Sequence, residues 1–172
     1  MTPQNALAEQ DATPKKSAVD GDDSATIETR FGTLTFQNAS LIRMPRGILG
    51  YADHQTFGLA NMPDPNLAQF KVLQSVEAAE LSFIVLPLEP GNDCIDEVDL
   101  RMACQMLSLD FDDSVVLLMV STRQIGPATQ ISVNLRAPII LDAANRIAWQ
   151  YVIPNSTYPV RQVIATVQPK DG

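Results

Sequence analysis

Val115-Val-Leu-Leu-Met-Val-Ser121 is an apolar run typical of a buried strand in this 172-residue chain. Leu81-Ser-Phe-Ile-Val-Leu86 is similar, and its apolar character predicts a strand covered on both faces. Gln130-Ile-Ser-Val-Asn-Leu-Arg136 alternates apolar with polar residues, as a strand with one buried face does. These three segments predict a core built on a sheet.

Further short β-prone segments lie on both sides of these runs, separated by turn residues. Gly32 predicts a bulge or tight bend between two of them, and Pro45 ends a third because proline cannot continue a hydrogen-bonded ladder. The additional predicted strands are Thr26–Phe31, Thr33–Phe36, Ser40–Met44, Phe57–Asn61, Phe70–Val76, Ile139–Leu141 and Arg146–Val152. About nine or ten strands predict a mainly β fold, a small antiparallel barrel or sandwich with one to two short helices.

The sequence predicts one clear helix, from Asp96 to Leu109. Apolar residues recur there at helical spacing, and acidic residues load the first turn, where the helix dipole favours them. The tail over residues 1–24 has few large apolar groups and is expected to be disordered, which leaves residues 25–172 as a single domain. No run is apolar enough to span a bilayer and no secretory leader is recognisable, so we expect a cytoplasmic protein that does not contact membranes.

No motif in the chain predicts catalysis. The single histidine, His54, has no supporting partner in its neighbourhood, and phosphate-binding, dinucleotide-binding and nucleophile-elbow motifs are missing from the sequence. Cys94 and Cys104 are expected to be reduced thiols and have no metal-ligand spacing. We therefore expect no enzyme activity, no metal and no cofactor.

The charge is unevenly distributed. The net charge of −8 disfavours nucleic-acid binding, which needs clustered Lys and Arg. The segment from Glu89 to Asp113 contains eight carboxylates and the single cation Arg101, so its net charge is −7. The chain from Ser114 onward has a net charge of +3. Such an acidic segment can steer a basic partner, although solvated carboxylates beside a helix are the alternative.

Three aspartates stand apart within the acidic segment. Asp110, Asp112 and Asp113 lie beyond the predicted helix end, where the dipole disfavours anions, so they are candidates for partner binding. Ile48, Leu49 and Tyr51, in a loop with two glycines, are candidates for an apolar contact with a partner; packing over a barrel mouth is the alternative.

Six segments, in order, give the sequence a recognisable signature. It resembles the flagellar assembly factor FliW family in Ile27-Glu-Thr-Arg-Phe-Gly-Thr-Leu-Thr-Phe36, Ile42-Arg-Met-Pro-Arg-Gly-Ile-Leu-Gly-Tyr51, Phe70-Lys-Val-Leu-Gln-Ser75, Leu81-Ser-Phe-Ile-Val85, Val133-Asn-Leu-Arg-Ala-Pro-Ile-Ile140 and Tyr158-Pro-Val-Arg161.

The resemblance implies a small barrel-like protein of the bacterial cytoplasm that binds flagellin and the translational regulator CsrA in exchange. It would sequester CsrA while flagellin is scarce and release it when flagellin accumulates. The alternatives are a flagellin chaperone that does not bind CsrA and a small ligand-binding barrel or hydrolase. We expect a monomer in the absence of partners.

Overall fold

A computed structural model describes residues 23–170. The described chain contains one α-helix, α1 (Glu97–Met106), and two short 3-10 turns, Asn38–Ser40 and Pro65–Leu67. The strands are β1 (Ser24–Thr29), β2 (Gly32–Gln37), β3 (Ile42–Arg43), β4 (Thr56–Asn61), β5 (Lys71–Ser75), β6 (Ser82–Pro87), β7 (Ser114–Ile125), β8 (Ala128–Val133), β9 (Ile139–Asp142), β10 (Ile147–Gln150) and β11 (Gln162–Val167). The predicted mainly β fold is confirmed.

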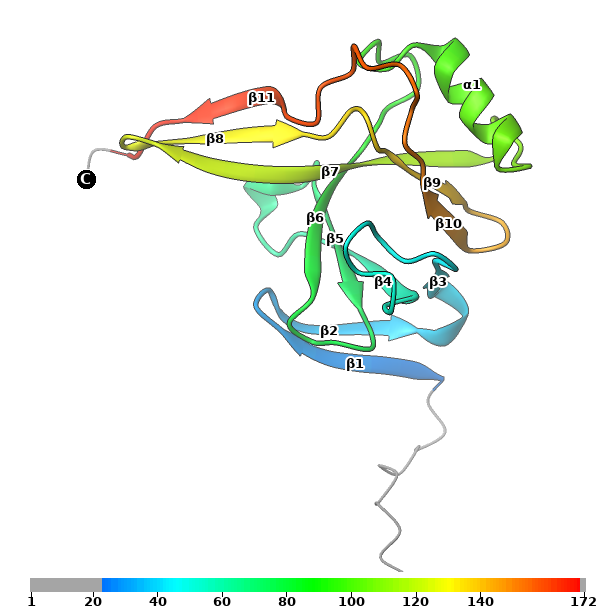
Figure 1. Ribbon diagram of the computed structural model, residues 1–172. Helices are drawn as coiled ribbons and strands as arrows, with labels where there is room; N and C mark the ends of the chain where they lie inside the picture. Colours follow the sequence, from blue (N-terminus) through cyan, green and yellow to red (C-terminus); the bar gives the residue numbers. More distant parts are fainter. Residues whose placement is uncertain (1–22, 171–172) are drawn as a thin grey trace, which may run out of the picture.

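Seven of the strands form a closed barrel (Figure 1). Going round the ring, they follow the order β7, β6, β5, β4, β3, β10 and β9, and β9 pairs again with β7. All contacts in the ring are antiparallel except that between β3 and β10, a single parallel pairing of Arg43 with Ile147. Closure removes the exposed edges that an open sheet of these strands would have.

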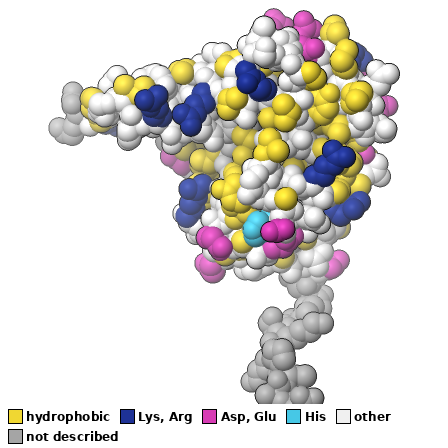
Figure 2. Space-filling model, in the orientation of Figure 1, with side chains coloured by type: hydrophobic (Ala, Val, Ile, Leu, Met, Phe, Trp, Pro, Cys, Tyr) yellow, Lys and Arg dark blue, Asp and Glu magenta, His cyan; other side chains and the backbone are white. Residues whose placement is uncertain are grey.

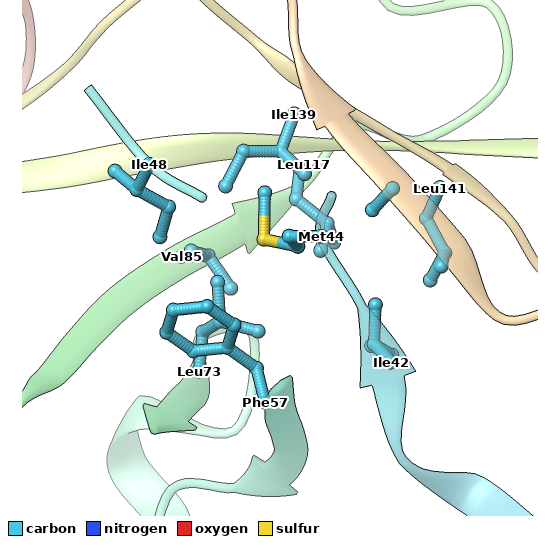
Figure 3. Packing of buried hydrophobic residues seen from close by; sticks show 10 residues of the cluster. Ile42, Met44, Ile48, Phe57, Leu73, Val85, Leu117, Ile139 and Leu141 are labelled. Carbon is cyan, nitrogen blue, oxygen red and sulfur yellow. The ribbon is translucent and has the colours of Figure 1, made fainter. Parts of the chain in front are cut away.

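The barrel interior is filled by apolar side chains (Figure 3). Phe57, Leu73 and Val85 come from three neighbouring strands, while Leu117 and Ile139 come from the side where the barrel closes. The predicted apolar runs therefore supply this core. A ligand-binding barrel would need a hollow interior, and these side chains occupy that space.

The strand β7 takes part in two sheets. Its first half pairs with β9 and β6, whereas Val120–Ile125 pairs with β8 and leaves the barrel. With β11 added to β8, these segments form a three-stranded arm that projects from the barrel (Figure 1). The sequence predicted that this strand ends at Ser121. It extends to Ile125 because the polar residues after Ser121 are held by backbone pairing rather than burial.

The hairpin β1–β2 lies against the barrel without joining its ring. Gly32, with φ +97°, makes the predicted tight bend. Phe36 is buried directly over Gly58, where an added Cβ atom would lie 2.3 Å from the Phe36 ring. β1 begins at Ser24, the last residue of the predicted tail, because Ser24 pairs with Gln37; residues 1–22 of that tail lie outside the described chain.

The helix α1 has its predicted start but ends earlier than predicted. Asp96 caps it by accepting a hydrogen bond from the Val98 N–H at 2.9 Å. At the other end Ser108 adopts φ +57°, and the N–H groups of Ser108 and Leu109 donate to Gln105 and Cys104 in a Schellman arrangement. The predicted helix end at Leu109 is thus wrong, because a serine occupies the left-handed position where the expected signal is glycine.

Candidate functional site

A groove of about 780 Å³ runs beside the N-terminus of α1. Its walls come from the loop between β6 and α1, the first turn of α1, the loop between α1 and β7, the start of β7, and Tyr158. Its floor is apolar, with Leu88, Ile95, Leu100, Phe111 and Val116 contributing. These residues belong to a second core, which packs outside the barrel under α1 and the segment following β10.

Five carboxylates line the groove above this floor. They belong to Glu89, Asp93, Asp96, Glu97 and Asp112, and no lysine or arginine lines it. Five of the eight acidic residues of the segment therefore line one concave surface. An apolar floor of low dielectric beside several like charges strengthens their field, which favours a cationic group on a ligand.

Tyr158 ties the C-terminal segment to α1 at one side of the groove. Its hydroxyl donates a hydrogen bond to Asp99 and accepts one from the Asp96 N–H at 3.0 Å. Partial burial, together with the bond to Asp99, raises the pKa of the Tyr158 hydroxyl, so the donor stays protonated. Arg136 supports the same segment by donating from Nε to the Tyr158 carbonyl at 2.9 Å.

Arg101, the single cation of the acidic segment, is engaged within that segment. Its Nε lies 2.7 Å from Oε1 of Glu97, and its guanidinium lies over the Phe111 ring at 4.2 Å. Both ion-pair partners are more than half exposed, so this pair adds little stability. The arginine does not neutralise the remaining carboxylates around the groove.

The three candidate aspartates have different surroundings. Asp112 lines the groove, whereas Asp110 and Asp113 do not. The Asp110 carboxylate accepts a hydrogen bond from the Asp112 N–H at 2.9 Å and so organises its own turn. All three side chains are exposed, which leaves them accessible to a partner.

The apolar candidates of the loop between β3 and β4 lie apart from the groove, since none of them lines it. Ile48 is 2% exposed and belongs to the barrel core (Figure 3), so its side chain is not available to a partner; here packing over the barrel replaces the predicted contact. Leu49 and Tyr51 are 62% and 43% exposed, and Tyr51 packs its ring edge on Phe83. Only these two remain candidates.

An apolar stripe on α1 was missed by the sequence reasoning. Val98, Met102 and Met106 follow one another at intervals of four residues, and all are more than half exposed. Their spacing is the signal that could have revealed the stripe, because residues four apart share a helix face. Figure 2 shows hydrophobic and acidic side chains close together over α1, while Lys and Arg side chains lie over the arm.

The two cysteines differ in accessibility. Both are free; Cys94 is exposed beside the groove, and Cys104 lies on the buried face of α1, where burial raises the pKa of its thiol. A raised thiol pKa and burial both suppress the reactive thiolate. Iodoacetamide at neutral pH should therefore alkylate Cys94 first, and Cys104 only after denaturation, as mass spectrometry of peptides can show. Equal rates in the native protein would contradict this assignment.

Among residues 23–170 no three His, Cys, Asp or Glu side chains are grouped to hold a metal ion. His54 lies in the loop before β4, and its Nδ1 has no hydrogen-bond partner in the part of the chain that the structure describes. No described helix is long and apolar enough to cross a membrane.

Comparisons with known proteins agree with one another. Residues 25–164 match the family model described as FliW protein. The chain is 32% identical to a protein named flagellar assembly factor FliW from Geobacter sulfurreducens, over 77% of this chain and 81% of that protein. A protein of the same name from Geotalea uraniireducens is 33% identical, over 77% and 79%.

A solved structure shares the fold. The crystal structure of the flagellar assembly factor FliW aligns with a TM-score of 0.60 and 22% identity, covering 80% of this chain and 95% of that one.

Proposed function

This chain belongs to the FliW family of flagellar assembly factors, and on that premise we propose that it binds CsrA and flagellin in exchange in the cytoplasm. While flagellin is scarce, the protein sequesters CsrA and so relieves repression of flagellin translation. Accumulated flagellin then occupies the protein, and the released CsrA stops translation. The protein acts by binding alone and makes no covalent bond.

The acidic groove is the observation that carries this proposal. A regulator that binds RNA must present basic surface, and five carboxylates above an apolar floor form a complementary face. The groove is preformed by the packing of α1 and the Tyr158 segment, so a partner need not order it on binding. Asp112 and the neighbouring Asp113 extend the acidic surface toward the start of β7.

A variant in which three carboxylates of the groove are replaced by uncharged amides tests whether the groove binds CsrA. Replacing Glu89→Gln, Asp93→Asn and Asp112→Asn together should weaken CsrA binding about tenfold, because each exposed charge pair contributes roughly 0.2–1 kcal/mol. Calorimetry with purified CsrA at low and high salt measures the affinity. Binding by the original protein should weaken with salt. Bound CsrA should also slow alkylation of Cys94, which lies between two groove residues.

Two matched variants provide controls. Asp110→Asn with Asp113→Asn removes two charges of the same loop outside the groove and should have a smaller effect, since asparagine keeps the turn formed by Asp110. Asp53→Asn with Glu80→Gln removes two exposed charges elsewhere and should leave affinity unchanged. Affinity that is equal for all variants and insensitive to salt would remove the groove from the proposal.

A second candidate is a flagellin chaperone that does not bind CsrA. The apolar stripe of Val98, Met102 and Met106 favours it, because methionine-rich helix faces bind apolar helices of varied sequence. Calorimetry with flagellin and with CsrA separates the two candidates. Flagellin binding without CsrA binding supports the chaperone, whereas displacement of CsrA by flagellin supports exchange.

A further inference from the structure

The arm ends in an open strand edge. β11 pairs with β8 on one side and has no neighbour on the other within residues 23–170. At the opposite end of the strand order, β9 pairs back to β7, so the nine-stranded sheet terminates at β11. Because the arm projects from the barrel, this edge faces open space (Figure 1).

The open strand has a composition that favours pairing. Gln162–Val167 contains no charged residue and no proline, and all six residues are exposed. Val163, Ile164 and Val167 are 41%, 40% and 52% exposed. Edge strands are usually protected by a charge, a proline, a bulge or a covering element. β11 contains neither a charge nor a proline, and its single irregularity lies between Val163 and Ala165, which leaves Ala165–Val167 in regular register with β8. The hairpin edge of β1, by contrast, carries Glu28 within the strand.

Positive charges flank this edge at both ends. Arg161 precedes β11 and Lys170 follows it, while Arg123 on β7 pairs with Gln130, which in turn pairs with Thr166 of β11. All three cations are exposed, and none forms an ion pair with a described residue. The strands of the arm contain no aspartate or glutamate, so the charges described along this edge are all positive.

The same charges oppose pairing between two copies of the chain. Antiparallel pairing of two β11 strands would bring Arg161 of one copy toward Lys170 of the other at both ends. Like charges facing each other across strands are destabilising. The flanking cations therefore protect the apolar edge from self-association while leaving it open to a strand of opposite charge.

We propose that the open edge of β11 is a docking site for an extended, acidic segment of a partner protein, which adds a strand to the arm. Backbone hydrogen bonds to β11 supply affinity, and apolar side chains of the added strand pack beside Val163 on one face and, beyond the bulge, beside Val167 on the other. Carboxylates flanking the added strand meet Arg161 and Lys170, while Arg123, two strands further in, adds only to the positive field. This surface is separate from the acidic groove and selects the opposite charge.

The proposal is tested on the full-length protein with synthetic peptides of about nine residues, a length sufficient for one strand. One peptide alternates Val and Thr in its centre and carries Glu and Asp at both ends; a second carries Lys at both ends instead. At low salt the acidic peptide should bind about tenfold more tightly, because several exposed ion pairs add their small contributions. Hydrogen exchange should slow at the β11 amides.

Two controls address the mode of binding. N-methylation of alternate residues in the acidic peptide removes backbone donors and should abolish binding. The variant with Arg161→Glu and Lys170→Glu should reverse the preference toward the Lys-flanked peptide, with an unchanged denaturation midpoint as evidence of folding. Equal binding of both peptides, retained binding of the N-methylated peptide, unprotected β11 amides, or dimers of the original protein that pair through β11 would overturn the proposal.

Discussion

Replacing Phe57 with alanine is expected to lower the free energy of unfolding by about 3–5 kcal/mol, the usual cost of removing a buried phenylalanine side chain. Phe57 is completely buried among Leu73, Val85 and their neighbours in the barrel interior. A closed barrel has little freedom to collapse around the cavity, because each strand is held by two neighbours. Urea unfolding followed by Trp149 fluorescence measures the change.

Leu49→Ala is the matched control for Phe57→Ala. The Leu49 side chain is 62% exposed, so its truncation should cost less than about 1 kcal/mol. The same variant also tests Leu49 as a partner contact, since loss of affinity without loss of stability would identify a binding residue. Similar unfolding free energies for both variants would contradict the assigned barrel core.

Gly47→Ala is expected to destabilise the protein by about 3 kcal/mol, because backbone strain of roughly 1–2 kcal/mol is joined by a steric clash. Gly47 has φ +61°, and an added Cβ atom would lie 2.5 Å from the Tyr51 carbonyl oxygen and 2.8 Å from Cα of Ala52. Both are backbone atoms, which cannot rotate away. The loop holding Ile48 in the core would have to shift.

Gly50→Ala separates strain from clash within the same loop. Gly50 has φ +87° but no atom within 4 Å of an added Cβ, so only the backbone cost of about 1–2 kcal/mol is expected. Chemical denaturation of the two variants gives the comparison. If Gly50→Ala were as destabilising as Gly47→Ala, the close approach at Gly47 would not be the cause.

Most strands were predictable because their apolar runs and turn residues are local signals. The strand β11 was not predicted: all of its residues are exposed, so burial imposes no pattern on its sequence. The polar end of β7 was missed for the same reason. Both segments are held by backbone pairing with β8, which follows β7 directly in a hairpin but lies well before β11 in the chain.

The candidate site was only partly predictable. Clustering of carboxylates between Glu89 and Asp113 indicated an acidic surface, but not that Glu89, Asp93 and Asp112 would line the same groove. Glycines around Ile48 suggested an exposed apolar loop, yet the turn directs Ile48 into the barrel and leaves Leu49 outside. Composition does not show which of two neighbouring apolar residues in a turn points into the core and which points to solvent.

The amino-acid sequence by itself determined the mainly β class, the start of α1 and the family, because periodicity, capping and motif order are properties of neighbouring residues. Tertiary structure alone decided that Val115-Val-Leu-Leu-Met-Val-Ser121 would both close the barrel and lead into the arm. It also decided that the carboxylates would gather over an apolar floor while the cations flank an open edge. These outcomes depend on strand pairing between residues far apart in the chain, for which no local pattern carries the register.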